Sequence, residues 1–198
     1  MSQHQAELLY DFGSPTSYLA FKQMPRIAER THARLLLTPV LLGGIFKATG
    51  NQSPANVPAK AKWMHADLAL WARQHGQVFN QNPHFPINTI SLMRGAYWAT
   101  GKGKLVEYSH VIFDAMWGEH PRNLGDEQVL RSVLVEAGYD AGDFQQGIAD
   151  PAVKDALKAS TEGAVARGVF GCPTIFVGEQ MFFGQDRLAF VEQALEQG

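Results

Sequence analysis

The strand-forming segments of this 198-residue chain lie near its two ends. Apolar runs predict strands at residues 7–12 and 34–40, and apolar side chains at helical spacing predict a helix from Pro15 between them, so residues 7–40 form a βαβ unit. Pro25 predicts a kink or a break in that helix. The strand pattern then disappears until residue 173. The two ends of the chain must therefore meet around one sheet.

The long segment between the ends is predicted to be helical. Its first part, residues 41–58, is rich in Gly, Asn and Pro and is expected to be a loop with one helical turn around Ile45. Apolar stripes, several of them followed by a stop signal such as Gly138, predict further helices. These lie at residues 60–75, 89–100, 105–117, 126–137 and 151–167.

The strand pattern returns at residues 173–177 and 181–183, and Gly178-Glu179 fits a two-residue hairpin turn between them. A terminal helix is expected over residues 185–197. The order β-α-β, helical insertion, α-β-β-α is that of a thioredoxin-like domain interrupted by a helical one. The predicted fold class is therefore α/β. The predicted domains are a thioredoxin-like unit, residues 1–58 and 168–198, and a helical insertion, residues 59–167.

Composition and charge exclude several classes of function. The net charge of −2 gives no basic face for nucleic acid or an anionic membrane, and no apolar run is long enough to span a bilayer. The first six residues show neither a basic nor an apolar region of a signal peptide, so a cytoplasmic location is expected. The seven histidines form no metal-binding spacing. Cys172 is the only cysteine, which excludes an intrachain disulfide and a Cys-x-x-Cys pair.

Ser14-Pro15 fits a helix start, because serine is a favoured N-cap and proline is tolerated at the first helical position. The unpaired N–H groups and the dipole of a helix N-terminus stabilise a nearby anion. Ser14 is therefore either a simple cap or part of an anion-stabilising site. In redox proteins of this topology the same loop carries Cys-x-x-Cys. Here it reads Ser-Pro-Thr-Ser, so disulfide exchange through this loop is excluded.

The whole chain resembles the kappa-class glutathione transferases and the related 2-hydroxychromene-2-carboxylate isomerases. Four motifs in the right order carry the resemblance. They are Tyr10-Asp11-x-x-Ser14-Pro15-x-Ser17, Gly50-Asn51-Gln52-x-Pro54 with Pro58-x-Lys60, Phe170-Gly171-Cys172-Pro173-Thr174, and Phe183-Gly184-Gln185-Asp186-Arg187.

The resemblance implies glutathione as cofactor and gives each motif a task. The Ser14 hydroxyl would donate to the glutathione sulfur and favour its thiolate. Cys172, before a cis Pro173, would pair through its N–H and C=O with the backbone of the glutathione cysteine. The Cys172 thiol is either a small apolar filler or the partner of glutathione in a mixed disulfide.

The remaining contacts implied by the resemblance lie at two other places. Asp186 would bind the γ-glutamyl ammonium, beside the helix N-terminus and Gln185 at its carboxylate, although the family often has serine at 185. Asn51 would be a polar contact and Lys60 the partner of the glycyl carboxylate. The alternative for Asp186 is an acidic residue that only complements the helix dipole, and the alternative for Lys60 is a solvated surface lysine. Trp63, one turn after Lys60, is either part of the wall of the same site or, as we expect, a core aromatic.

The leading hypothesis is a glutathione-dependent cis–trans isomerase of the hydroxychromene-carboxylate type, acting on a small aromatic substrate in aromatic catabolism. One rival is a kappa-type transferase that conjugates glutathione to an electrophile. The other is a non-enzymatic thioredoxin-like binding module in which Ser14 only caps its helix. An apolar pocket for the second substrate would draw on pairs such as Tyr97-Trp98 and Met116-Trp117, which are otherwise core residues. The family implies a homodimer.

Overall fold

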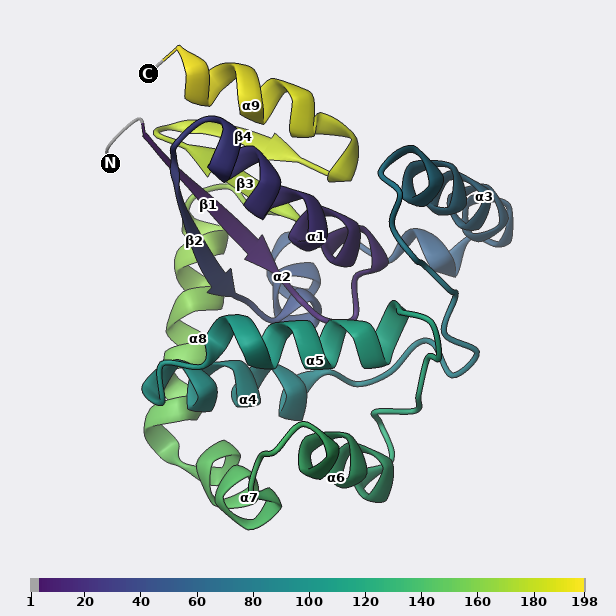
Figure 1. Ribbon diagram of the computed structural model, residues 1–198, viewed down its shortest axis with the longest axis vertical. Coiled ribbons are helices and arrows are strands. Elements are labelled where there is room, and N and C mark those ends of the chain that lie inside the picture. Colours follow the sequence, from purple (N-terminus) through teal and green to yellow (C-terminus); the bar gives the residue numbers. More distant parts are fainter. Residues whose placement is uncertain (1–3, 198) are drawn as a thin grey trace.

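The computed structural model describes residues 4–197 and contains a four-stranded mixed sheet with strand order β2-β1-β3-β4 (Figure 1). The strands are β1 (Gln5–Tyr10), β2 (Arg34–Pro39), β3 (Thr174–Val177) and β4 (Gln180–Phe183). β1 runs parallel to β2 and antiparallel to β3, so that Leu8 lies opposite both Leu37 and Ile175. The βαβ unit and the closing hairpin are confirmed, and the two ends of the chain form one sheet.

The helices follow the predicted order, and their bounds are as follows. They are α1 (Pro15–Arg30), α2 (Leu42–Thr49), α3 (Pro58–Gln74), α4 (Ile90–Gly101), α5 (Leu105–Trp117), α6 (Glu127–Glu136), α7 (Ala141–Ala149), α8 (Pro151–Ala166) and α9 (Leu188–Glu196), with 3₁₀ helices η1 (Pro54–Asn56) and η2 (Gln185–Arg187). This is the predicted thioredoxin-like α/β fold with a helical insertion. No helix within residues 4–197 combines the length and apolar character needed to span a lipid bilayer.

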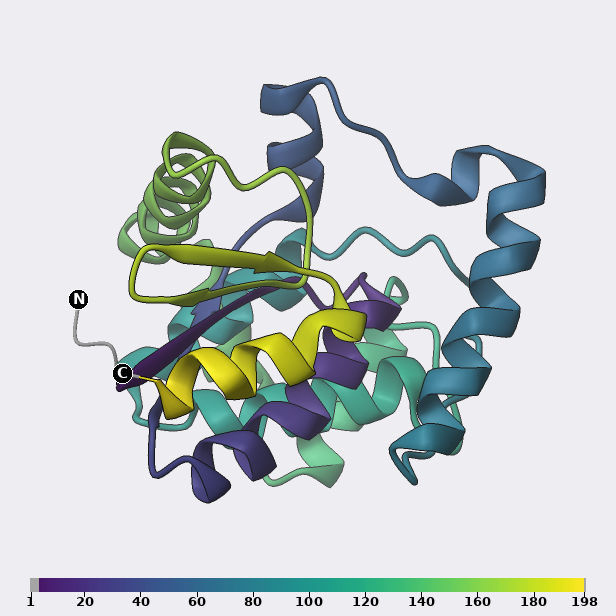
Figure 2. The same cartoon turned by 90° about the horizontal axis from the view of Figure 1, so that it is seen from above.

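The two faces of the sheet pack against different helices, as Figure 2 shows. Because side chains alternate along a strand, Leu8 and Tyr10 of β1 join the larger core, which includes side chains of α1 and α9. Leu9 points to the other face and packs in a smaller core with side chains of α2 and α8, among them Ile45 and Ala164. The sheet is therefore covered on both sides, which explains why β1 is apolar throughout.

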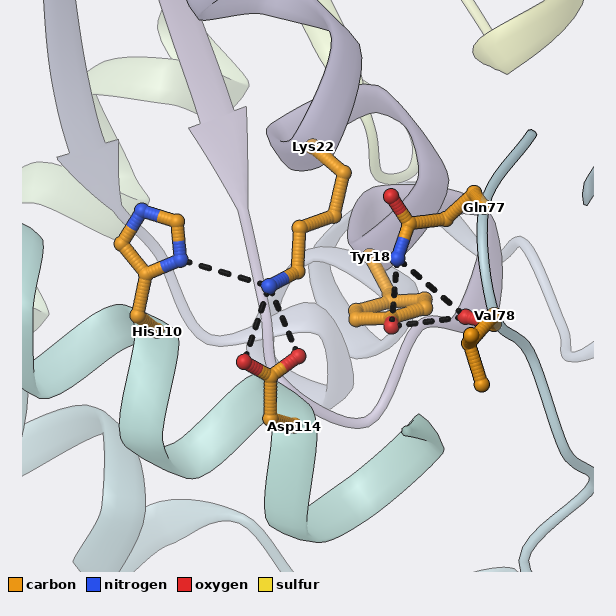
Figure 3. A network of polar contacts seen from close by, with 6 residues as sticks. All are labelled: Tyr18, Lys22, Gln77, Val78, His110 and Asp114. Carbon is orange, nitrogen blue, oxygen red and sulfur yellow. Dashed lines mark hydrogen bonds and ion pairs between the residues drawn. The ribbon is translucent and has the colours of Figure 1, made fainter. Parts of the chain in front are cut away.

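A polar cluster joins α1 to α5 beside the larger core (Figure 3). Lys22 Nζ lies 2.7 Å from Asp114 Oδ1 and 3.3 Å from His110 Nδ1, and the Lys22 side chain is only 15% exposed. Nearby, the Tyr18 hydroxyl donates to the Val78 carbonyl at 2.8 Å. These contacts tie the first helix of the βαβ unit to the helical segment.

Five local features differ from the predictions. The first strand ends at Tyr10, because Asp11 turns out of the ladder to accept backbone N–H groups of the following loop. α1 continues through Pro25 without a break. Residues 42–49 form a full helix that buries Ile45, and residues 141–149 form an additional helix, α7. The last helix begins with the 3₁₀ turn η2 before α9.

Candidate active site

A cavity of about 1070 Å³ lies beside the N-terminus of α1. The β1–α1 loop, α2, α3, the loop before α4 and the segments before β3 and after β4 supply its walls. Six of the predicted site residues line it: Ser14, Asn51, Lys60, Cys172, Gln185 and Asp186. Pro173 is buried behind them and follows a cis peptide bond, as the resemblance implied. Segments far apart in the sequence thus meet at one cavity.

Ser14 is the N-cap of α1 and is only 4% exposed. Its Oγ accepts the Ser17 N–H at 3.1 Å and donates to the Cys172 carbonyl at 3.0 Å. The Thr16 hydroxyl lies 2.8 Å from Ser14 Oγ and donates to the same carbonyl at 3.2 Å. The Ser14 and Thr16 hydroxyl groups therefore share the Cys172 carbonyl as acceptor at the N-terminus of α1.

The first turn of α1 leaves one amide free for a ligand. Pro15 has no N–H, and the N–H groups of Ser17 and Tyr18 bond to Ser14. The Thr16 N–H has no acceptor among residues 4–197. Since an unpaired amide at a helix N-terminus stabilises an anion, this donor supplements the Ser14 hydroxyl.

The backbone of Cys172 differs in one respect from the expectation that both its N–H and its C=O pair with the ligand. Its carbonyl already accepts the Ser14 and Thr16 hydroxyl groups, so it is not an open acceptor for a ligand amide. Its N–H, by contrast, has no partner within the described residues. Burial raises the pKa of the Cys172 thiol well above its ordinary value, and the Asp11 carboxylate raises it further. The thiol is thus held in its neutral form.

Asn51 and Lys60 line the cavity and are both exposed. Asn51 Nδ2 donates to the Phe170 carbonyl at 2.8 Å, which ties the segment after α2 to the one before Cys172. Lys60 is in the first turn of α3 and forms no ion pair within residues 4–197. Its ammonium group is therefore free for an anionic ligand.

Gln185 and Asp186 begin η2 directly after Gly184. Gly184 has φ of +100°, and a Cβ there would meet Asp186 Oδ1, so a glycine is required. Among residues 4–197, the backbone N–H groups of Gln185 and Asp186 have no acceptor. A carboxylate side chain and two free amides thus face the same region of the cavity.

Asp11 lies in the wall of the cavity, although no sequence signal pointed to a role for it. It is 1% exposed, and its two oxygens accept the N–H groups of Gly13 and Leu42, each at 2.8 Å. Burial raises the pKa of this carboxyl, and these two hydrogen bonds oppose the shift. Asp11 therefore joins the loop before α1 to the start of α2 and fixes the two walls relative to each other.

Asp67, on α3, is a further carboxylate in the wall that the sequence did not single out. Burial and then the nearby Asp186 raise its pKa above the ordinary value of 3.8. Lys60 lies seven residues earlier on the same helix, about 10 Å away along its axis. The cavity therefore carries an ammonium group at one place and a pair of carboxylates at another, which suits a ligand charged at both ends.

The apolar part of the cavity differs from the expected one. Trp98, Met116 and Trp117 are buried in the larger core and do not line it. Trp63 lines the cavity and is 67% exposed, so the prediction of a core aromatic was wrong. The other apolar lining residues include Met64, Phe85, Ile87 and Phe183. They supply an apolar surface beside the charged positions.

Comparison with known proteins gives a consistent result. Residues 6–196 match the model of the DsbA-like thioredoxin domain family. The chain is 32% identical to 2-hydroxychromene-2-carboxylate isomerase of Sphingobium xenophagum, over 96% of each chain. It is 31% identical to human glutathione S-transferase kappa 1, over 96% of this chain and 89% of that protein. A solved 2-hydroxychromene-2-carboxylate isomerase superposes with a TM-score of 0.86 at 27% identity, over 98% of this chain and 95% of that one.

Proposed function

Because this chain belongs to the DsbA-like thioredoxin family, among relatives that include 2-hydroxychromene-2-carboxylate isomerases and kappa-class glutathione transferases, we propose that it is a glutathione-dependent cis–trans isomerase of the hydroxychromene-carboxylate type. The observation that carries the proposal is the β1–α1 loop. Ser14 and Ser17 occupy the two positions that a Cys-x-x-Cys motif would fill, the Thr16 N–H between them is free, and Cys172 is the only cysteine of the chain. A site that stabilises a thiolate therefore needs a sulfur from a ligand.

The residues of the cavity fit glutathione, a tripeptide with two carboxylates, one ammonium group and one thiol. Lys60 supplies a cation for the glycyl carboxylate, and the free N–H groups of Gln185 and Asp186 suit the γ-glutamyl carboxylate. Asp186, with Asp67 beside it, balances the ammonium group. The Cys172 N–H suits a backbone carbonyl of the ligand, and Asn51 holds the loop that carries Phe170.

When bound, glutathione would supply a thiolate that adds to a conjugated carbon–carbon double bond, permits rotation and leaves again. The task of the protein is to keep that sulfur ionised and in place. The Ser14 hydroxyl and the Thr16 N–H stabilise the negative charge, aided by the dipole of α1. To donate to the sulfur, the Ser14 hydroxyl must turn away from the Cys172 carbonyl. The Thr16 hydroxyl can then remain as the donor to that carbonyl.

The second substrate would lie against the apolar wall. Trp63, Phe85 and Phe183 supply aromatic faces, which suits a flat aromatic compound and excludes water from the reacting bond. Asp11 and the Cys172 thiol take no part in proton transfer in this proposal, because each is buried and already fixed by its surroundings. The buried Cys172 thiol is assigned a filling role.

The second candidate function is conjugation of glutathione to an electrophile. The 31% identity to human glutathione S-transferase kappa 1 supports it, and the same Ser14 site would serve both reactions. Product analysis separates them: the purified protein is incubated with glutathione and 2-hydroxychromene-2-carboxylate, and isomer and free thiol are both measured. Isomer formation with constant free thiol supports the isomerase. Loss of free thiol in step with product supports the transferase. Neither reaction, together with no heat of glutathione binding, supports a binding module and overturns the proposal.

We also propose a cytoplasmic homodimer, as the family suggests. Reduced glutathione is the thiol of the cytosol, which supports that compartment. Exposed apolar side chains at the edge strand β4 and on α9, such as Met181 and Phe190, support burial against a second copy. Light scattering coupled to size exclusion tests the oligomeric state, and a monomer at micromolar concentration would refute the dimer.

A further inference from the structure

A second cavity, of about 530 Å³, lies between α2, α4 and α8. α2 forms part of the wall of both cavities, since Gly44 and Lys47 line each of them. Figure 2 shows α2 and α8 side by side above the sheet, and the two helices are in contact. Leu41 and Ile90 also line both cavities, whereas Arg94 of α4 and the lining residues of α8 belong to the second cavity and give it its own surface.

The second cavity is rich in positive charge. Four basic side chains line it: Lys47, Arg94, Lys154 and Lys158. The one acidic side chain in its wall, Glu162, lies 3.9 Å from Lys158 Nζ. The other three cations form no ion pair within residues 4–197. Because the whole chain carries a net charge of −2, this grouping of unpaired cations concentrates positive potential at one concave site.

The floor of the same cavity is apolar. Leu157 is 4% exposed, and Leu41, Ile90 and Val165 surround it. Among residues 4–197, the one hydroxyl side chain that lines this cavity is that of Thr161, which accepts the Leu41 N–H at 2.9 Å and donates to the Leu157 carbonyl at 2.7 Å. The floor thus offers no free polar group, which favours a ligand with an apolar body over a small inorganic ion.

We propose that this second cavity binds an organic anion, namely an aromatic ring system that carries one carboxylate. The ring lies on the apolar floor, and the carboxylate faces the half-buried Arg94 and Lys154. The volume lies within the range of small-molecule sites. The proposal does not depend on glutathione as the ligand of the first cavity, because Arg94, Lys154 and Leu157 line the second cavity and not the first.

Isothermal titration of the full-length protein with 2-naphthoate tests the proposal. We expect saturable binding. Arg94→Gln and Lys154→Gln should each weaken it about tenfold, because each removes one charge partner of the carboxylate. Arg131→Gln, an exposed change on α6, and Lys60→Gln, in the first cavity, should leave the affinity unchanged. The uncharged 2-naphthalenemethanol should bind at least tenfold more weakly, and inorganic phosphate should not displace the naphthoate.

Several outcomes would overturn the inference. These are the absence of binding at millimolar naphthoate, equal affinity for the uncharged analogue, and an affinity that Lys60→Gln lowers but Arg94→Gln does not. Displacement by phosphate at equal concentration would show a general anion site and would likewise contradict it. The two glutamine variants should unfold at the wild-type temperature, since neither side chain has an ion pair to lose, so a loss of binding would report on the site itself.

Discussion

The Ser14 hydroxyl donates a 3.0 Å hydrogen bond to the carbonyl of Cys172, 158 residues further along the chain. This bond joins the N-terminus of α1 to the segment before β3. It also occupies the one hydrogen that Ser14 has to offer. Any ligand that takes this hydrogen must compete with the Cys172 carbonyl.

Ser14→Ala should lower the turnover number about 10²- to 10³-fold, as the loss of one donor to a reacting anion does. The dissociation constant of glutathione should change little, because the other contacts remain. Ser14 is also an N-cap, so its removal costs about 1 kcal/mol of stability. Asp126→Ala removes the N-cap of α6 and controls for that loss. Unchanged turnover of Ser14→Ala would refute the activating role.

Thr16→Val should lower turnover less than Ser14→Ala does. Without the Thr16 hydroxyl, Ser14 alone is left to donate to the Cys172 carbonyl and is less available to the sulfur. The thiol pKa of bound glutathione, followed by thiolate absorbance, should therefore rise. The double variant should be no slower than Ser14→Ala alone, since Thr16 acts through Ser14. Additive losses would show an independent role for Thr16.

The affinity for glutathione should fall in acid because of Asp67. The pKa of Asp67 is raised above the ordinary value of 3.8, so this carboxylate gains a proton at a higher pH than an ordinary aspartate does. The ionised form attracts the γ-glutamyl ammonium, so affinity should be constant near neutral pH and fall as the pH drops through the raised pKa. Asp67→Asn should bind more weakly at neutral pH and lose most of this dependence in a calorimetric titration. An unaltered pH profile would exclude Asp67 as the titrating group.

Stability should also fall in mildly acidic solution, partly through His110. Burial and then Lys22 lower its pKa below 6.5 (Figure 3). The unfolded chain therefore takes up the proton first, and the folded state loses stability as the pH falls below about 6.5. His110→Gln should reduce this slope in thermal unfolding curves. The pKa of His75 is also lowered by burial, so we expect His75 to cause the rest of the loss of stability in acid.

Two glycine substitutions in helices should have opposite effects. Alanine is favoured over glycine in a helix by about 1 kcal/mol. At Gly163 of α8 nothing lies within 4 Å of an added Cβ, so Gly163→Ala should stabilise the protein. At Gly147 of α7 the added Cβ would overlap the Trp98 ring, so Gly147→Ala should destabilise it by about 1–3 kcal/mol. Urea unfolding measures both, and a stabilised Gly147→Ala would contradict the close packing.

Helices and strands were predicted best from the sequence where the local signals, such as an apolar stripe and its flanking residues, agreed. The bounds of α5, residues 105–117, were predicted correctly from the apolar stripe. α7 was missed because Gly142 and Gly147 lower the helical propensity of a short segment. Its stability comes from the Asp140 cap and from the burial of Phe144, which only the tertiary structure reveals. α2 was taken mainly as loop for a similar reason, since Gly43 and Gly44 precede the buried Ile45.

The candidate site could be predicted only in part. Spacing alone gave Ser14 as a cap, and only the resemblance connected it with Cys172 and Asp186. Thr16 and Asp67 went unnoticed, because a threonine in a first turn and an acidic residue on a helix are ordinary surface features. Their importance depends on what the fold places beside them, namely the Cys172 carbonyl and Asp186. Long-range contacts of this kind leave no local pattern.

The pairing of β1 with β3 has a consequence for synthesis of the protein. β1 leaves the ribosome long before β3, Gln185 and Asp186 do, because the whole helical segment is translated between them. Until they emerge, the Ser14 hydroxyl has no Cys172 carbonyl to bind, and the wall opposite Lys60 is missing. A nascent chain can form α3 to α8 earlier, yet it acquires its ligand site only after β3 and η2 have been synthesised. Ligand binding thus reports that β3 and η2 have joined the βαβ unit.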